Sequence, residues 1–399
     1  MNKKNDTFYD IVIIGGGIAG LYTAYRALLA DSNRKICILE KYHRLGGRIH
    51  TYEKPDFPIS IEYGAGRFHR GHRLLCKLLD DLGLTKKVVP IQNVNQPPLL
   101  KHLIDRLCHM YHGRKNDNDL EKSLYEYVIR HGIMNMDEFA YFEKNYGYST
   151  ELFYMNIKDA MLLLEDMQSA SYLGLRGGLS QVVDGLESRL IELGCRIWKG
   201  FHVTNVVRNH EEFLVYNAKK NMIHCETCVL AIPKNDGLLK MPILRPIYSH
   251  LQSIISSPLC RIYAVYDKDP ITKRVWFDSL TKTVATNALR LVIPIDKESG
   301  SIMISYSDDK YAKWWNHIYE HGGKRALKTE LQRLVKQQFP WSGDNIVPKK
   351  IHIAYWNAGV GYWRTGIKNS EKSINSVIFN FAHFNFYQSK SGIRSLYIC

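Results

Sequence analysis

The residues with the clearest chemistry are three glycines near the start of the chain, Gly15, Gly17 and Gly20, which follow a short β-branched run. Gly15 lets the chain turn tightly, and Gly17, which has no Cβ, lets the backbone come close to a pyrophosphate. Gly20 lets the next helix lie close to the strand. The first residues of that helix, Ile18 and Ala19, would turn free N–H groups and the positive end of the helix dipole toward the phosphates. This arrangement predicts a dinucleotide-binding turn.

Glu40 supports this interpretation, because it follows a second apolar strand pattern, 35–39, at the spacing of a ribose-binding acid. Its carboxylate can accept hydrogen bonds from ribose hydroxyls, and it repels a 2′-phosphate. The acid therefore favours NAD or the adenosine of FAD as the ligand. The alternative is a glycine-rich turn that holds no ligand. The complete order of strand, turn, helix and acid argues against that alternative.

Small residues stand beside arginines in two further places. Adjacent glycines let the backbone pass close to a cofactor, and a guanidinium group suits phosphate oxygens because it stays charged and can bind them in a bidentate way. Arg48 directly follows a glycine pair, whereas a solvated surface charge is an equal alternative for Arg44 and for Arg67. The candidate cofactor-binding residues of these two blocks are Arg44, Gly47, Arg48, Gly64, Ala65, Gly66 and Arg67.

The chain resembles the flavin-containing amine oxidase family of monoamine, polyamine and L-amino-acid oxidases in the block Arg44-Leu45-Gly46-Gly47-Arg48-Ile49-His50-Thr51, which follows the glycine turn and the acid. The resemblance implies FAD, with Glu40 at the adenosine ribose, Arg48 near the pyrophosphate, residues 64–68 beside the flavin and Val203 at the adenine. It also implies oxidation of the C–N bond of a small-molecule amine by O2, giving an imine or aldehyde and H2O2. Some members attach the flavin to a cysteine, and residues 355–363 contain none, which favours noncovalent FAD.

Three residues are candidates for catalysis. The family usually places a lysine beside the flavin N5 atom, and Arg261 stands at the matching position. Arginine keeps the charge, but its planar fork places the donors differently and it does not deprotonate usefully. Trp356 and Tyr362 are candidates for the aromatic rings that steer an amine toward the flavin, with packing in a β-rich core as the alternative for each.

The last predicted strand, Ser395–Cys399, ends the sequence, whereas the family continues with Gly-Glu and a helix that closes over the flavin. We therefore expect either a truncated gene product or a fragment. Two alternatives to an amine oxidase stay open, and this departure and Arg261 favour the first of them. One is a catalytically inactive binding or structural protein of the same fold. The other is an FAD-dependent desaturase or isomerase that acts on an apolar substrate.

The length of 399 residues predicts two domains, and the strand and helix patterns, together with the resemblance, predict an α/β fold. One is a Rossmann-type, FAD-binding domain with a parallel sheet and helices, which we expect to comprise residues 8–83, 174–236 and 375–399. The other is an α+β substrate domain with a mixed sheet, comprising 237–374 and a helical insertion at 84–173.

Composition limits the partners that we expect. The formal net charge is +15, but the basic residues are scattered, which predicts a solvated basic surface and no specific nucleic-acid site. The sequence has neither an apolar run of membrane-spanning length nor a signal-peptide pattern, so we expect a cytoplasmic protein. The sequence makes no prediction of the oligomeric state.

The cysteines do not predict a metal site. Cys225 and Cys228 form a Cys-x-x-Cys pair, but no second pair follows at zinc spacing. The pair lies in a predicted strand, where residues three apart are expected to face opposite sides.

Overall fold

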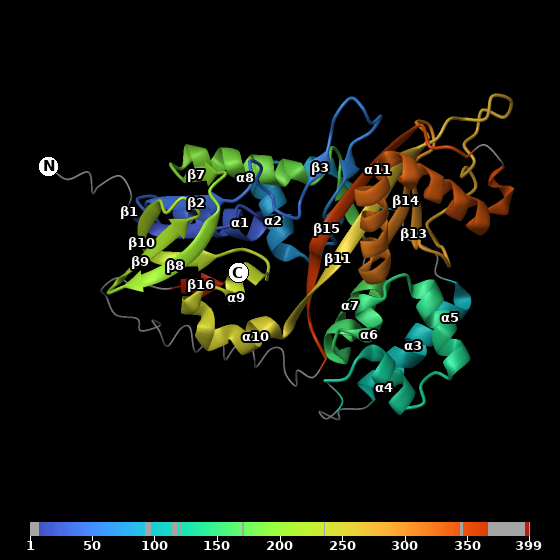
Figure 1. Ribbon diagram of the computed structural model, residues 1–399, viewed down its shortest axis with the longest axis horizontal. Coiled ribbons are helices and arrows are strands. Elements are labelled where there is room, and N and C mark those ends of the chain that lie inside the picture. The colour runs from blue at the N-terminus through green and yellow to red at the C-terminus, as the bar shows by residue number, and fades with distance from the viewer. Residues whose placement is uncertain are drawn as a thin grey trace.

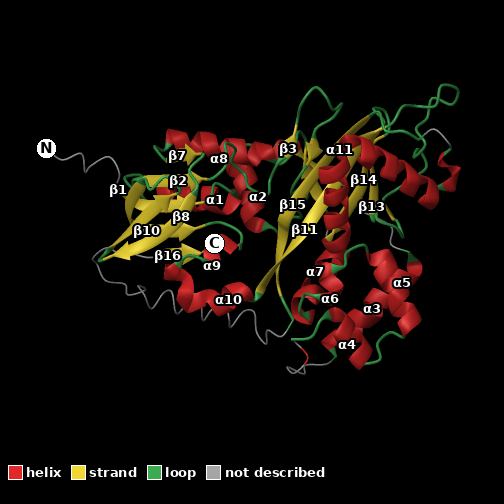
Figure 2. Cartoon of the chain, in the orientation of Figure 1, coloured by secondary structure: helices red, strands yellow, loops and turns green. Residues whose placement is uncertain are grey.

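The computed structural model describes residues 8–91, 97–113, 119, 121–169, 171–234, 236–343, 346–365 and 396–398. Two β-sheets lie side by side along the long axis of the molecule, and a group of helices lies beneath the second sheet in the view of Figures 1 and 2. The chain passes between these parts more than once, so that segments far apart in the sequence become neighbours.

The first sheet is parallel at its centre and antiparallel at one side. Its strands are β1 (Phe8–Ile14), β2 (Ile36–Glu40), β7 (Arg196–Lys199), β8 (Val203–Asn209), β9 (Glu212–Asn217), β10 (Met222–Leu230) and β16 (Leu396–Ile398). The order is β7-β2-β1-β10-β9-β8, in which β7, β2, β1 and β10 run parallel. The predicted last strand of the chain is found as β16, which pairs in parallel with the second half of β10.

Helices cover both faces of this sheet, because its central strands are apolar on both sides and have no polar face to turn toward water. One face packs against α1 (Ile18–Ala30) and α8 (Ser180–Glu192). The other face packs against α9 (Asp236–Leu239), η3 (Pro242–Ile247) and α10 (Tyr248–Gln252). The carboxyl ends of the parallel strands remain the place where side chains can meet a ligand.

The second sheet is antiparallel. Its strands are β11 (Ile254–Val265), β12 (Thr283–Val284), β13 (Leu291–Asp296), β14 (Ser301–Asp308) and β15 (Lys350–Trp363). Their order is β12-β13-β14-β11-β15. The helix α11 (Asp309–Gln338) lies across this sheet and breaks at Gly323, whose φ of 59° and ψ of −160° are not helical. The sequence predicts only the second arm of this helix, near 324–338.

The helical group beneath the second sheet has an apolar core of its own. It consists of α3 (Pro98–His112), α4 (Leu124–Arg130), α5 (Met136–Tyr146), α6 (Thr150–Phe153) and α7 (Ile157–Ser169). Capping boxes fix two of the starting points, with Ser123 and Glu126 at α4, and Asn135 and Glu138 at α5. The helical patterns that the sequence shows in this region are therefore confirmed as helices.

Short elements join these parts. They are the hairpin β3 (Thr51–Tyr52) and β4 (Ile61–Glu62), α2 (Arg73–Asp81), η1 (Thr85–Lys87), the pair β5 (Val88–Pro90) and β6 (Leu173–Leu175), and η4 (Pro340–Ser342). Residues 366–395 lie outside the described part of the chain, so most of the predicted segment 375–399 is not described. The division into two domains stays a prediction. No helix among the described residues is long and apolar enough to cross a membrane.

The Cys-x-x-Cys pair corrects one prediction. Cys225 and Cys228 do not face opposite sides, because both side chains are buried in the same apolar core and they hydrogen-bond to each other. The reason is a shift in the burial pattern of β10 at Glu226 and Thr227, where β10 exchanges β9 for β16 as its neighbour. The bond to Cys225 and burial raise the pKa of the Cys228 thiol well above its ordinary value. These are unreactive thiols of the core.

Candidate functional site

The glycine turn between β1 and α1 has a backbone that only glycine can follow at two positions. Gly15 has a φ of +112°, and a Cβ there would lie 2.4 Å from the carbonyl oxygen of Ala231. A Cβ on Gly20 would lie 2.0 Å from the carbonyl oxygen of Gly15. Both glycines therefore serve the packing of α1 against the sheet, and they keep the turn in place.

Gly17 differs from Gly15 and Gly20, because no described neighbour would clash with a side chain at this position. It has a φ of −75°, and a Cβ there would meet only the Cα of Gly47, at 3.9 Å. Gly17 is the N-cap of α1 without a side-chain cap, and Ala19 in the first turn is exposed. The N–H groups that follow Ile18 in the first turn of α1, such as that of Ala19, thus remain available to an anion, whereas Ile18 adjoins the β-bridge between Gly17 and Gly46.

Glu40 lies at the end of β2 beside this turn. Its carboxylate accepts hydrogen bonds from the backbone N–H of Gly16 at 2.7 Å and of Tyr42 at 2.8 Å. Each carboxylate oxygen can accept a further bond, so the group can still bind hydroxyls. The backbone N–H of Phe201 donates to the carbonyl of Glu40 at 2.8 Å. Val203, two residues farther along, packs against the apolar core that includes Leu39 and Phe201.

The two arginines of the glycine block have different surroundings. The guanidinium of Arg44 donates to the carbonyls of Leu45 and Gly47, at 3.1 and 2.8 Å, and lies over the ring of Trp356. Arg44 therefore holds its own loop together. Arg48 is exposed, donates to the carbonyl of Gly359 at 3.2 Å and forms no ion pair with a described residue. Of the two, Arg48 is the one whose charge remains available to a phosphate.

The second small-residue block, 64–67, lies directly on the first. The N–H of Ala65 donates to the carbonyl of Arg48 at 2.9 Å, and a Cβ on Gly64 would lie 1.8 Å from that same oxygen. A Cβ on Gly66 would lie 2.9 Å from the side chain of Glu62. Contacts this short require glycine at 64, so the two predicted blocks form one surface.

Arg261 on β11 does not point freely toward a ligand. Its guanidinium donates to the carbonyl of Glu62 at 2.8 Å and to the carbonyl of Gly64, and it lies over the ring of Tyr306 at 4.5 Å. The hydroxyl of Tyr263 donates to the same Glu62 carbonyl at 2.6 Å. Arg261 thus fixes the backbone of the second small-residue block to the second sheet.

The structure does not bring Trp356 and Tyr362 together. Both lie on β15, six positions apart, which is about 20 Å along a strand. The indole of Trp356 donates to the carbonyl of Tyr63 at 2.6 Å, whereas Tyr362 packs against the helical group and hydrogen-bonds to Glu151. They do not form a facing pair.

Sequence reasoning missed a set of side chains that meet around Arg67. We name it the cationic cluster; its members are Arg67, Lys282, Tyr148, Tyr172 and Tyr306. The guanidinium of Arg67 lies 4.3 Å from the centre of the Tyr172 ring, and the rings of Tyr148 and Tyr306 meet edge to face at 5.6 Å. Burial, followed by the charge of Arg67, lowers the pKa of Lys282 to about 8. These residues come from five separate parts of the sequence, so no local motif could have found them.

Glu151, at α6, lies beside this cluster and is buried. The hydroxyls of Tyr146 and Tyr362 hydrogen-bond to its carboxyl, and its neighbour Asp308 accepts the N–H of Thr150 at 2.9 Å. Burial is the main reason that the pKa of Glu151 rises to about 7, although the tyrosine bonds and Arg67 oppose this rise. Glu151 therefore changes its charge near neutral pH.

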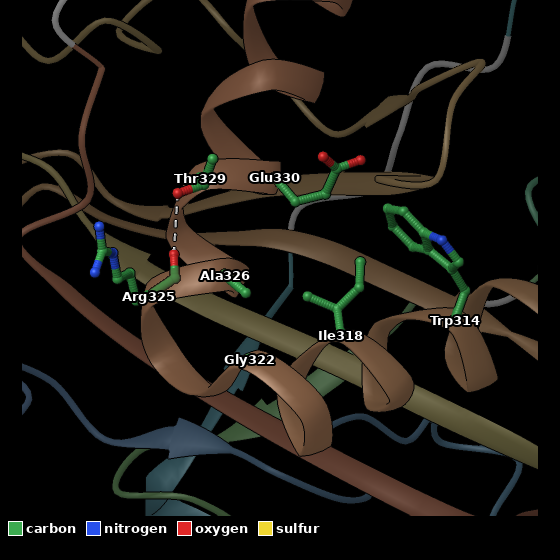
Figure 3. A pocket seen from close by; sticks show the side chains of 7 residues that line it. All are labelled: Trp314, Ile318, Gly322, Arg325, Ala326, Thr329 and Glu330. Atoms are coloured by element: carbon green, nitrogen blue, oxygen red, sulfur yellow. Dashed lines mark hydrogen bonds between the residues drawn. The ribbon is translucent and has the colours of Figure 1, made fainter.

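Two hollows lie away from Glu151 and the cationic cluster. One, of about 390 Å³, borders the outer side of the glycine block and includes Arg44 and Ser180 but neither Gly17 nor Glu40. The other, of about 510 Å³, opens at the break in α11, where side chains from both arms of the helix line it (Figure 3). Its polar groups are engaged within the helix, since Thr329 donates to the carbonyl of Arg325 and Glu330 pairs with Arg333. Neither hollow coincides with the glycine turn.

Comparisons with known proteins match the part of the chain that contains the glycine turn and Glu40. A family model described as an NAD(P)-binding Rossmann-like domain matches residues 13–82. An L-amino-acid oxidase from Mus musculus is 42% identical over 74 residues, which are 18% of this chain and 11% of that protein. The curated relatives are thus matched over less than a fifth of their own length.

Solved structures match over nearly the whole chain. A putative protoporphyrinogen oxidase from Exiguobacterium sp. 255-15 has a TM-score of 0.71 at 15% identity, covering 99% of this chain and 94% of that one. Cyclohexylamine oxidase from Brevibacterium oxydans IH-35A has a TM-score of 0.70 at 14% identity, covering 98% of this chain and 92% of that one. These structures confirm the α/β fold class, and the relatives named as L-amino-acid oxidases support the resemblance to the flavin-containing amine oxidases.

Proposed function

We propose that this chain is an FAD-dependent oxidoreductase that oxidises the C–N bond of an amine, with O2 as acceptor and an imine or aldehyde and H2O2 as products. The observation that carries the proposal is the surface formed by the glycine turn and the two small-residue blocks. A side chain on Gly17 would enter open space, whereas Gly15, Gly20 and Gly64 are required by packing. The relatives named as amino-acid and amine oxidases support the reaction type.

The residues present fit a noncovalently bound FAD. The uncapped start of α1 and the exposed Arg48 would hold the pyrophosphate, and Glu40 would accept hydrogen bonds from the adenosine ribose. Val203 would lie at the adenine, and residues 64–67 would pass beside the flavin. When bound, FAD supplies the acceptor for the hydride.

The chain's own part in the reaction would be to orient the substrate. Arg67 stands at the end of the block that passes the flavin, is accessible and forms no ion pair with a described residue. Its charge would bind an anionic group of the substrate, which supports an amine of the amino-acid type, like the substrate named for the mouse relative. The rings of Tyr148 and Tyr306 would exclude water beside it. Trp356 and Tyr362 would act as supports, because each is bound to its own neighbours.

A second candidate function is a catalytically inactive binding protein of the same fold. The observation that favours it is the engagement of Arg261, whose guanidinium binds two carbonyls and is not free for a group beside the flavin. If this second function is correct, the purified chain should contain bound flavin that amines do not reduce.

An absorption spectrum of the purified chain, taken before and after anaerobic addition of an L-amino acid, tests the proposal. We expect flavin bands near one per chain that bleach with the amino acid. Gly17→Ala is the matched variant, because its Cβ clashes with no described atom but would block the pyrophosphate. It should keep the fold, measured by circular dichroism, and lose at least 90% of the flavin, about a tenfold loss in occupancy. A wild-type chain without flavin after reconstitution would contradict the proposal.

A further inference from the structure

Tyr63 stands directly before the second small-residue block and anchors its first end. The four residues of that block, 64–67, include two glycines, and none of the four is buried. The second end of the block is fixed by Phe68, which is 1% exposed and pairs with Leu173 through backbone hydrogen bonds of 2.9 and 2.7 Å. The first end is held by Arg261, from β11, and by the contacts of Tyr63.

The side chain of Tyr63 belongs to a closed set of four side chains, which we name the Tyr63 network; its members are Tyr52, Asp56, Tyr63 and His352. The hydroxyl of Tyr63 bonds to Nδ1 of His352 at 2.8 Å, and Nε2 of His352 lies 3.2 Å from the carboxylate of Asp56. The hydroxyl of Tyr52 donates to that carboxylate at 2.8 Å, and the rings of Tyr52 and Tyr63 stack at 4.9 Å. Each polar side-chain atom of the Tyr63 network thus has a partner within it, which makes the arrangement rigid.

The two ring nitrogens of His352 have different roles in the Tyr63 network. Burial is the main reason that the pKa of His352 lies below its ordinary value, so the ring is neutral at neutral pH. An ionised carboxylate only accepts hydrogen bonds, so Nε2 carries the proton and donates to Asp56. Nδ1 then accepts the hydroxyl hydrogen of Tyr63. Asp56 thus orients His352, and His352 in turn orients Tyr63.

The backbone of Tyr63 is tied to the same strand as its side chain. The carbonyl of Tyr63 accepts the indole N–H of Trp356 at 2.6 Å, and the guanidinium of Arg44 lies over the Trp356 ring at 5.6 Å. His352 and Trp356 both lie on β15. The position of β15 therefore determines where the second small-residue block begins.

We propose that Tyr63 is a positioning residue for FAD: through His352 and Asp56, it holds the second small-residue block in the place where the flavin would bind. This inference rests on the proposed function for the position of the flavin. A block without buried side chains has to become ordered when a ligand binds, and this cost lowers the affinity unless the block is ordered beforehand. The Tyr63 network would order the block before FAD arrives.

The affinity for FAD tests the proposal without turnover. Dilution of the flavin-loaded protein releases FAD, and the flavin fluorescence then gives the dissociation constant. Tyr63→Phe keeps the stacked ring but removes the bond to His352, so we expect FAD to bind about fivefold to tenfold more weakly. Tyr248→Phe is the matched control, because the Tyr248 hydroxyl donates to the carbonyl of Met241 at 2.8 Å, on the other face of the first sheet. Equal FAD affinity in the wild type and Tyr63→Phe would overturn the proposal.

Variants of His352 separate positioning from a purely structural role. Asparagine can offer its amide oxygen as an acceptor to the Tyr63 hydroxyl, whereas leucine cannot. His352→Asn should therefore keep the FAD affinity within about twofold of the wild type, and His352→Leu should weaken it as Tyr63→Phe does. Combining Tyr63→Phe with His352→Leu should weaken FAD binding no further than His352→Leu alone, because both changes remove the same bond. Additive losses in the double variant would overturn the proposal.

The outcomes distinguish this inference from the proposed function. If the wild type does not bind FAD, both fail. If FAD binds and Tyr63→Phe weakens it, but no amine bleaches the flavin, the oxidase activity fails and the positioning role of Tyr63 stands. If amines bleach the flavin and Tyr63→Phe binds FAD as tightly as the wild type, the positioning role fails and the proposed function stands.

Discussion

We propose a negatively charged ligand for both the glycine turn and the cationic cluster, but the two regions would bind it in opposite ways. In the turn, backbone N–H groups would bind the ligand; Gly15 and Gly20 keep the turn packed, and Gly17 leaves space for the ligand. In the cationic cluster, side chains would do the binding, and the guanidinium of Arg67 meets a ring that is distant in the sequence, that of Tyr172.

This difference decides how each region tolerates change. A glycine that touches backbone cannot be replaced without moving the fold, whereas a charged side chain that has no partner can be removed at little cost in stability. Replacing Gly15 or Gly20 should therefore disrupt both the fold and ligand binding, whereas replacing Gly17 should disrupt ligand binding alone. The cluster should lose function alone. The predictions below test this contrast, beginning with the largest effect.

Gly64→Ala should have the largest effect. A Cβ at this position would lie 1.8 Å from the carbonyl oxygen of Arg48, and backbone atoms on both sides cannot give way. We expect a loss of about 4 kcal/mol in the free energy of unfolding, or failure to fold, which urea denaturation followed by circular dichroism would measure.

Gly17→Ala is the control for this prediction. Its Cβ would have ordinary contacts, so we expect a loss of no more than about 1 kcal/mol, the usual cost of replacing glycine by alanine at an N-cap. If the two variants were equally stable, the two small-residue blocks would not lie on each other as described.

The same contrast explains what the sequence could predict. The glycine turn, Glu40 and the parallel sheet were predictable, because strand, turn, helix and acid follow one another along the chain and each residue type has a local reason. The different surroundings of Arg44 and Arg48 were not, because the carbonyls that bind Arg44 are found only once the loop has folded.

The sequence could not predict the roles of residues that depend on tertiary contacts. Lys282 and Glu151 have no motif around them, and their importance comes from burial and from neighbours that are distant in the sequence. Trp356 and Tyr362 are candidates from the sequence because the amine oxidase family uses facing aromatic rings and both lie in an aromatic-rich part of the chain. An extended strand separates such residues, so their closeness in sequence does not bring their side chains together.

Glu151→Gln should have an effect that depends on pH. Burial raises the pKa of Glu151 from 4.5 to about 7 in the folded protein, so folding favours the protonated form. The wild type is therefore most stable below the unfolded pKa and loses about 3 kcal/mol as the pH rises through the folded pKa. The free energy of unfolding of Glu151→Gln should lack this loss with rising pH.

Urea denaturation at about pH 5 and about pH 8 measures the effect. The stability of Glu151→Gln relative to the wild type should rise by roughly 2 to 3 kcal/mol between the two pH values. Glu298→Gln, at an exposed carboxyl, should give no such change. A difference between Glu151→Gln and the wild type that is the same at both pH values would mean that Glu151 titrates as an ordinary acid.

His352→Gln should have the smallest effect, and it concerns a contact that joins the second small-residue block to β15 of the second sheet. The hydroxyl of Tyr63, next to Gly64, bonds to Nδ1 of His352 at 2.8 Å, while Nε2 lies 3.2 Å from the carboxylate of Asp56. Burial lowers the pKa of His352 although Asp56 opposes this, so the folded protein favours the neutral ring, with Nδ1 accepting the Tyr63 bond. The contribution of this group is present above the unfolded pKa and is lost as the pH falls through the folded pKa.

We therefore expect His352→Gln to cost about 1 kcal/mol at pH 8 and less at pH 5, measured by urea denaturation, with the exposed His43→Gln unchanged at both. A cost that grows toward low pH would mean that the charged ring holds Asp56 in the folded protein, and the contact would then be an ion pair instead of a neutral hydrogen-bonded link.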